Sequence, residues 1–161
     1  MSTFMGYVRD FFGNYLLMSA MASWLMAQIL KIFTGVYRDR HVNLAVLMFS
    51  TGGMPSSHSA TVLGLMTAAV IKYGIASPYV AICGVLAAIV IIDATGVRYE
   101  TGKQSKMLNK IVQELFKDTE NAEVHFTEFI GHTPFQVFIG VLLGITVAIV
   151  MSFVFKQSIW S

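Results

Sequence analysis

The sequence predicts an all-α integral membrane protein: a small bundle of about four transmembrane helices, with one short re-entrant segment and one interfacial amphipathic helix. Of its 161 residues, 55% are hydrophobic and 12% are charged, whereas soluble domains carry roughly 25% charged residues. The mean hydropathy is +0.66. This composition, with a net charge of +2, excludes a disordered tail, a nucleic-acid-binding protein and a disulfide scaffold. Residues 1–161 are expected to form one domain.

Three segments have the length and composition of a membrane-spanning helix: Tyr15–Phe33, Gly74–Ile92 and Phe135–Phe155. The first is interrupted by Gln28 and Lys31 near its end, and the other two carry no charge over nineteen and twenty-one residues. Because a spanning helix needs about 20 apolar residues, we predict one transmembrane helix in each segment.

The segment Val42–Ile71 is predicted to hold a further span, because His58 is its only ionisable residue. The run TGGMP at 51–55 breaks it, so the helix is expected at Pro55–Ile71 with the proline near its first turn. The preceding Val42–Ser50 is too short to span. It is expected to be re-entrant or to lie at the surface, because irregular backbone at that depth must be covered by protein or face water.

One long polar stretch, Asp93–Gly131, separates the last two spans. Apolar residues recur in it at helical spacing between Met107 and Phe116, with lysines on their flanks. This pattern predicts an amphipathic helix, either at the membrane surface or docked on the end of the bundle.

The distribution of basic residues indicates how the bundle is oriented. With four spans, both termini lie on one side of the membrane, and the connections Ile32–Val42 and Asp93–Gly131 lie on the other. The positive-inside rule places the more basic side in the cytoplasm, so we expect a multi-pass protein of the cell membrane with this face cytoplasmic. Counting Lys31, that side holds eight of the eleven basic residues: Lys31, Arg38, Arg40, Arg98, Lys103, Lys106, Lys110 and Lys117.

Residues suited to phosphate chemistry gather at the same face. The start of the helix after Pro55 offers backbone N–H groups and a positive dipole end to an anion. Arginine offers a planar fork for phosphate oxygens, and histidine can attack phosphorus or exchange protons near pH 7. A lipid phosphate is therefore the expected ligand. The residues concerned are Lys31, Arg38, Arg40, Ser56, Ser57, His58, Asp93, Arg98 and His132.

Several of these residues also have a simpler interpretation. A lysine such as Lys31 near the end of a span can extend to the lipid headgroups, and Ser56 or Ser57 can cap a helix. Asp93 at a helix C-terminus opposes the dipole and should have a partner, such as Arg98. Glycines of the later spans, including Gly84, Gly140 and Gly144, are expected to serve close helix packing, which would also permit two copies of the chain to pair.

Three motifs lie between the spans in a fixed order: GGMPSSHSA at Gly52–Ala60, DATGVR at Asp93–Arg98 and GHTP at Gly131–Pro134. Together with the hydrophobic spacing, they resemble the divergent branch of the type-2 phosphatidic acid phosphatases, described as acid phosphatase/vanadium-dependent haloperoxidase-related membrane proteins. The resemblance covers most of the chain.

The first two blocks of the wider superfamily are matched closely. Its first block is a lysine, six residues and then Arg-Pro; Lys31 and Arg38 have this spacing, with Asp39 in place of the proline. Its second block, Pro-Ser-Gly-His, resembles Pro55–His58, with Ser57 in place of the glycine.

The third block is split in this sequence. Arg98 stands for its arginine, and His132 stands for its histidine thirty-four residues later. Gln136 occupies the position four residues after the histidine, where the divergent branch usually has a glutamate. A neutral amide can fix the tautomer of an imidazole but does not stabilise the cation that forms, so Asp93 is an alternative orienting group.

The resemblance implies metal-independent hydrolysis of a phosphomonoester or diphosphate on a lipid through a phosphohistidine, without a cofactor. His132 would attack phosphorus and His58 would protonate the departing oxygen. The alternatives are a non-catalytic lipid-phosphate-binding or assembly protein on the same scaffold, and a small transporter. In the phosphatase, the phosphate would be held by Lys31, Arg38, Ser56, Ser57 and Arg98.

Overall fold

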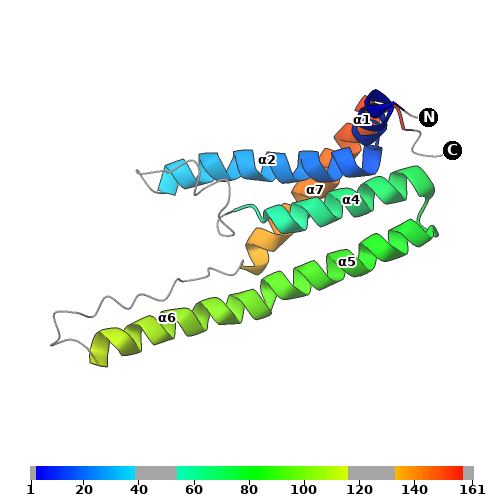
Figure 1. Ribbon diagram of the computed structural model, residues 1–161. Coiled ribbons are helices and arrows are strands. Elements are labelled where there is room, and N and C mark those ends of the chain that lie inside the picture. The colour runs from blue at the N-terminus through cyan, green and yellow to red at the C-terminus, as the bar shows by residue number, and fades with distance from the viewer. Residues whose placement is uncertain (1–2, 39–53, 116–132, 158–161) are drawn as a thin grey trace.

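The expected all-α fold is confirmed by the computed structural model, which describes residues 3–38, 54–115 and 133–157 (Figure 1). Within these residues every element is a helix. Their bounds are Phe4–Phe12 for α1, Tyr15–Arg38 for α2, Ser57–Tyr73 for α4, Pro78–Thr95 for α5, Val97–Leu115 for α6 and Pro134–Val154 for α7.

Helix α4 is the centre of the bundle and packs against α2, α5 and α7, while α2 also contacts α7. The end of the bundle where α4 and α7 begin and α2 and α5 finish is called the motif end here. The opposite end, with α1 and the last turn of α7, is called the terminal end (Figure 1).

Small residues at every fourth position let the central helices approach closely. A Cβ at Gly144 would collide with the carbonyl oxygen of Ala60, and one at Gly64 with the Ser23 hydroxyl. Such stripes are typical of helix contacts in membranes. Gly84 differs from the expectation, because its nearest neighbour is the Met66 methyl at 3.8 Å. The buried stripes are Ser19, Ser23 and Ala27 on α2; Ser56, Ala60, Gly64 and Ala68 on α4; and Gly140, Gly144, Ala148 and Ser152 on α7.

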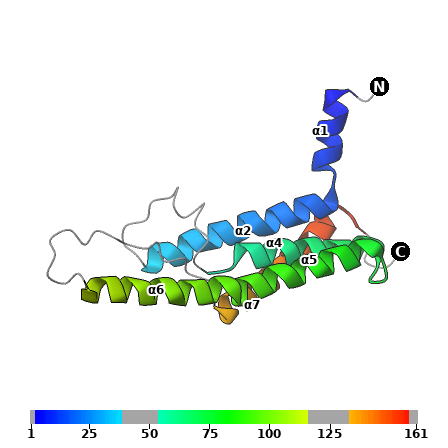
Figure 2. The same ribbon diagram turned by 60° about the horizontal axis from the view of Figure 1, so that its bottom comes forward.

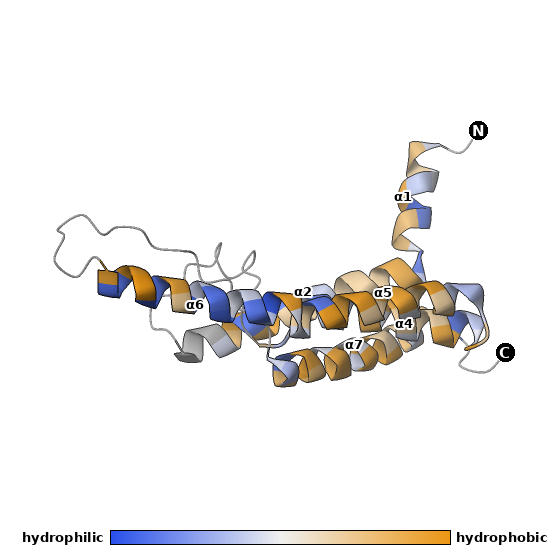
Figure 3. Ribbon diagram, turned by 90° about the horizontal axis from the view of Figure 1, so that it is seen from below, coloured by the Kyte–Doolittle hydropathy of each residue, from blue (hydrophilic) through white to orange (hydrophobic). Residues whose placement is uncertain are grey.

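Three described segments are long and apolar enough to cross a membrane: Tyr15–Thr34, Pro78–Leu115 and Pro134–Val154. Figure 3 shows hydrophobic residues along α4, α5 and α7.

Helix α4 has 17 residues and begins at Ser57. Pro55 lies near the first turn as predicted, because it directly precedes the N-cap Ser56, and the helix begins two residues after the expected start. The predicted segment Val42–Ser50 lies outside the described residues.

The amphipathic helix expected in the polar stretch corresponds to α6. It follows α5 after Gly96 and extends beyond the motif end along the direction of α5 (Figures 1 and 2). Among the described helices it contacts α5 alone, so docking across the bundle is not observed there. Sequence reasoning missed α1, an exposed helix before the first span (Figure 2).

Candidate active site

The first turn of α4 directs three serines inward and one histidine outward. Ser56 caps the helix, because its hydroxyl oxygen accepts the Ser59 backbone N–H at 3.4 Å and the Ser59 hydroxyl at 3.0 Å. Ser56, Ser57 and Ser59 are buried, whereas His58 is exposed. The capping role considered for Ser56 is therefore confirmed, and the His58 imidazole is left accessible at the motif end.

Lys31 points into the bundle and not toward lipid headgroups. It is 2% exposed, and its Nζ donates a hydrogen bond to Ser57 Oγ at 3.1 Å. It continues the every-fourth-residue stripe of α2, so its stem lies where the other stripe residues pack. Burying an ammonium group is costly unless it is hydrogen-bonded. The Lys31 ammonium group is therefore buried at the start of α4. The interpretation that Lys31 extends to the lipid headgroups is wrong.

The first turns of α4 and α7 are joined directly. The backbone N–H of Ser56 donates to the carbonyl oxygen of Gln136 at 3.2 Å. Gly140 permits this approach, because a Cβ there would meet the Ser56 carbonyl oxygen and the Cβ atoms of Ser56 and Ser59. Since a helix N-terminus carries roughly half a positive charge, two such charges lie close together at the motif end.

Helix α7 begins with a capping box between Thr133 and Gln136. The Gln136 backbone N–H donates to the Thr133 hydroxyl at 3.4 Å, and Gln136 Oε1 accepts the Thr133 backbone N–H at 3.0 Å. His132 directly precedes this box and lies outside the described residues. The side-chain oxygen expected to orient that imidazole is thus engaged in capping the helix.

Asp93 pairs with Arg98 across the break between α5 and α6. Arg98 Nε donates to Asp93 Oδ2 at 2.5 Å, and the two side chains are 48% and 39% exposed. The expected partner of Asp93 is therefore confirmed. The charges of Arg98, Lys31 and Asp93 all act on the His58 imidazole, so residues from four helices share one neighbourhood at the motif end.

The remaining predicted residues are less well defined. Arg38 is the last residue of α2, and its side chain is not described; Arg40 lies outside the described residues. No three His, Cys, Asp or Glu side chains come together as a metal site within the described ranges. Sequence reasoning missed Thr34, whose hydroxyl donates to the Met54 carbonyl at 2.7 Å and ties the approach to α4 onto α2. No sequence signal marks this threonine.

The described residues form a bundle of apolar helices in which a buried lysine contacts a Pro-Ser-Ser-His helix start, which defines a helical membrane protein. The chain matches the Divergent PAP2 family over residues 12–147 and belongs to that family. It is 34% identical to the uncharacterized membrane protein YuiD of Bacillus subtilis (strain 168), over 88% of this chain and 96% of that protein. No solved structure matches it. The resemblance inferred from the motifs is confirmed, and the matched region includes every candidate site residue.

Proposed function

We propose that the protein is a membrane lipid-phosphate phosphatase with its active site at the motif end. The observation that carries this proposal is the buried Lys31 ammonium on Ser57 at the start of α4. The start of α7 adjoins it through Ser56, and both His58 and Arg98 lie in the same neighbourhood. Lys31 and the two helix starts contribute positive charge there, which suits a phosphoryl group better than a neutral ligand, while Arg98 is paired with Asp93.

Charge stabilisation is the first part of the proposed mechanism. During phosphoryl transfer, negative charge spreads over the three equatorial oxygens. Lys31, Arg38 and Arg98 would hold these oxygens, while the first-turn amides near Ser57 would complete the cradle. Because Lys31 is already buried and oriented, its charge needs little rearrangement during the reaction, which is the condition under which electrostatic catalysis is most effective.

Covalent transfer is the second part. A ring nitrogen of His132 would form a bond to phosphorus as the bond from phosphorus to the lipid oxygen breaks, and His58 would donate a proton to that departing oxygen. Water would then attack the phosphohistidine, with His58 accepting its proton. The products are inorganic phosphate and the dephosphorylated lipid, and both histidines return to their starting forms.

The side of the membrane that the site faces restricts the substrate class. With the motif end in the cytoplasm, as the basic residues indicate, phosphatidate or phosphatidylglycerophosphate in the inner leaflet of the cell membrane would reach it. With the motif end outside, a prenyl diphosphate would be the natural substrate. We therefore propose that the motif end faces the cytoplasm and that the substrate is a phosphomonoester of a glycerophospholipid.

The test is phosphate release by the purified full-length chain in detergent with EDTA. The panel contains phosphatidate, phosphatidylglycerophosphate and a prenyl diphosphate. Release is expected with at least one of them, and its loss is expected in His132→Ala and in His58→Ala. His125→Ala, which lies outside all three motifs, is the matched control and should retain activity. A folded wild-type protein that is inactive on the whole panel would refute the proposal.

One observation favours a second candidate function, a lipid-phosphate-binding or assembly protein without turnover. Gln136 is an amide where the family usually has a carboxylate, and its Oε1 is used in the capping box of α7. In serine proteases, converting the orienting acid to an amide lowers the rate by about 10⁴. Saturable binding of phosphatidate without phosphate release would favour this function, and Gln136→Glu should then raise activity if the amide is the cause.

A further inference from the structure

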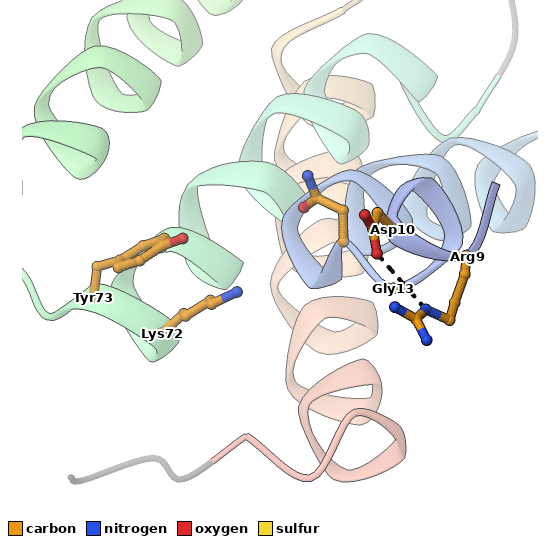
Figure 4. Close-up of a pocket in the computed structure, with 6 residues that line it drawn as sticks. Arg9, Asp10, Gly13, Lys72 and Tyr73 are labelled. Atoms are coloured by element: carbon orange, nitrogen blue, oxygen red, sulfur yellow. Dashed lines mark ion pairs between the residues drawn. The ribbon is translucent and has the colours of Figure 1, made fainter. Parts of the chain in front are cut away.

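The terminal end holds a polar hollow far from the candidate active site. It is a shallow hollow, widely open to the outside, with a volume of about 410 Å³. It lies between α1, the turn into α2 and the last residues of α4 (Figure 4). The lining residues are Arg9, Asp10, Gly13, Asn14, Lys72 and Tyr73.

Two cations from different helices line this hollow. Figure 4 shows Lys72 and Tyr73 extending from the end of α4 toward the turn at Gly13, with Arg9 and Asp10 on the other side. Asp10 is the one carboxylate among the lining residues, and its oxygen lies 3.8 Å from Arg9 Nε in a highly exposed pair. Since such exposed pairs are weak, Arg9 can exchange this contact for a stronger anion. The hollow therefore has a net positive lining.

Helix α1 indicates what surrounds the hollow. None of its residues is buried, although apolar side chains make up most of it. A short helix with exposed aromatic residues and a charged side is typical of the interface between headgroups and acyl chains. It ends three residues before Tyr15, where the first span begins, which places the hollow at headgroup level. The exposed apolar residues are Phe4, Met5, Tyr7, Phe11 and Phe12.

We propose that this hollow binds the phosphate group of an anionic phospholipid in the leaflet at the terminal end. Arg9 would hold phosphate oxygens with its planar fork and Lys72 would add a point charge, while α1 lies among the upper acyl chains. The lining contains no histidine, so this is a binding site and not a second catalytic centre. The inference does not rest on the proposed phosphatase activity.

The test compares lipid binding by the purified full-length chain and its variants, measured by native mass spectrometry. Phosphatidylglycerol and phosphatidylcholine with the same acyl chains are titrated separately. Lys72→Gln and Arg9→Gln should each weaken phosphatidylglycerol binding about five-fold, because one basic residue near an anionic surface contributes by that order. Binding of phosphatidylcholine, whose choline cation offsets the phosphate charge, should weaken by less than about two-fold.

The matched control is Lys156→Gln. Lys156 follows Phe155, whose ring packs on Tyr15 at the terminal end, and it is exposed but does not line the hollow. The same charge change there should alter binding by less than about two-fold if position and not net charge decides affinity. Equal loss in all three variants would overturn the proposal, as would wild-type binding in both Lys72→Gln and Arg9→Gln. Glycerol phosphate at millimolar concentration should not compete; competition would show a free-anion site and overturn the lipid assignment.

Discussion

The two ends of the bundle use basic residues in opposite ways. At the motif end, Lys31 is buried and hydrogen-bonded to Ser57, and the helix termini beside it are the positive ends of α4 and α7. At the terminal end, Lys72 is exposed at the negative end of α4. Lysine is therefore enclosed and hydrogen-bonded in a positive setting at one end, and exposed beside the Tyr73 ring at the other. The first setting suits a reaction in which charge develops, and the second suits reversible binding of a headgroup.

Helix packing is also closer at the motif end than at the terminal end. Gly140 brings α7 onto Ser56 at the motif end. At the terminal end, α2 and α7 are connected by the large ring of Tyr15, whose hydroxyl donates to the Ala148 carbonyl at 3.0 Å. Tyr15 also packs on Phe155. Close backbone approach thus occurs where the candidate active site must hold a precise geometry.

The largest expected difference between the two ends is in the rate of phosphate release when Lys31 or Lys72 is replaced singly by methionine. Lys31→Met should lower phosphate release roughly 10²- to 10³-fold, as for other preorganised charges in active sites. Lys72→Met should leave the rate within about two-fold, because it lies at the opposite end. The measurement is the initial rate at saturating lipid substrate. Similar losses in both variants would remove the functional distinction between the ends.

Adding one methyl group should separate tight packing from loose packing. Gly144→Ala should destabilise the protein by about 1–3 kcal/mol, because its Cβ would collide with the backbone of α4. Gly84→Ala should change stability by less than about 0.5 kcal/mol, since its Cβ would meet ordinary contacts. Unfolding by titration with a denaturing detergent measures both. If the stability of the Gly144→Ala variant were unchanged, α4 and α7 would have to lie farther apart than in this structure.

Removing the N-caps of α4 and α5 should produce smaller losses of stability, which also differ between the two ends. Ser56→Ala should cost about 1–2 kcal/mol, because it removes a helix cap and leaves the buried Ser59 hydroxyl without its acceptor. Ser77→Ala removes the cap of α5 at the terminal end, where the bond to the Tyr79 N–H is exposed, and should cost about 0.5–1 kcal/mol. The same unfolding assay ranks them, and the reverse order would contradict the burial of the motif end.

The smallest effect on stability is expected from the ion pair of Asp93 and Arg98. Both side chains are partly exposed, so Asp93→Asn should change unfolding by less than about 1 kcal/mol. Phosphate release should nevertheless fall, because the pair positions Arg98 near His58. Glu100→Gln breaks a neighbouring surface pair with Lys103 and should leave both properties unchanged. A loss of stability without a loss of activity in Asp93→Asn would assign the pair a structural role.

The sequence by itself determined the all-α membrane fold and the approximate positions of three long apolar helices. Uncharged runs of about 20 residues are sufficient to predict spanning helices, and α7 begins at Pro134, one residue before the predicted Phe135. The positions of Lys31, His58 and Asp93 at the ends of the predicted spans also indicated that these residues belong to one face. These features depend on composition and on neighbours within one or two helical turns, so they can be read along the chain.

The tertiary structure alone decided which way these residues face. Whether Lys31 extends to lipid or enters the bundle depends on the rotation of α2 against α4, and the bond between Ser56 and Gln136 depends on the crossing of α4 and α7. The hollow needs the end of α4 to lie near the turn between α1 and α2, about sixty residues earlier in the chain. Such contacts arise from the packing of whole helix surfaces. A stripe of small residues permits close approach of another helix, but the stripe does not determine which helix that is.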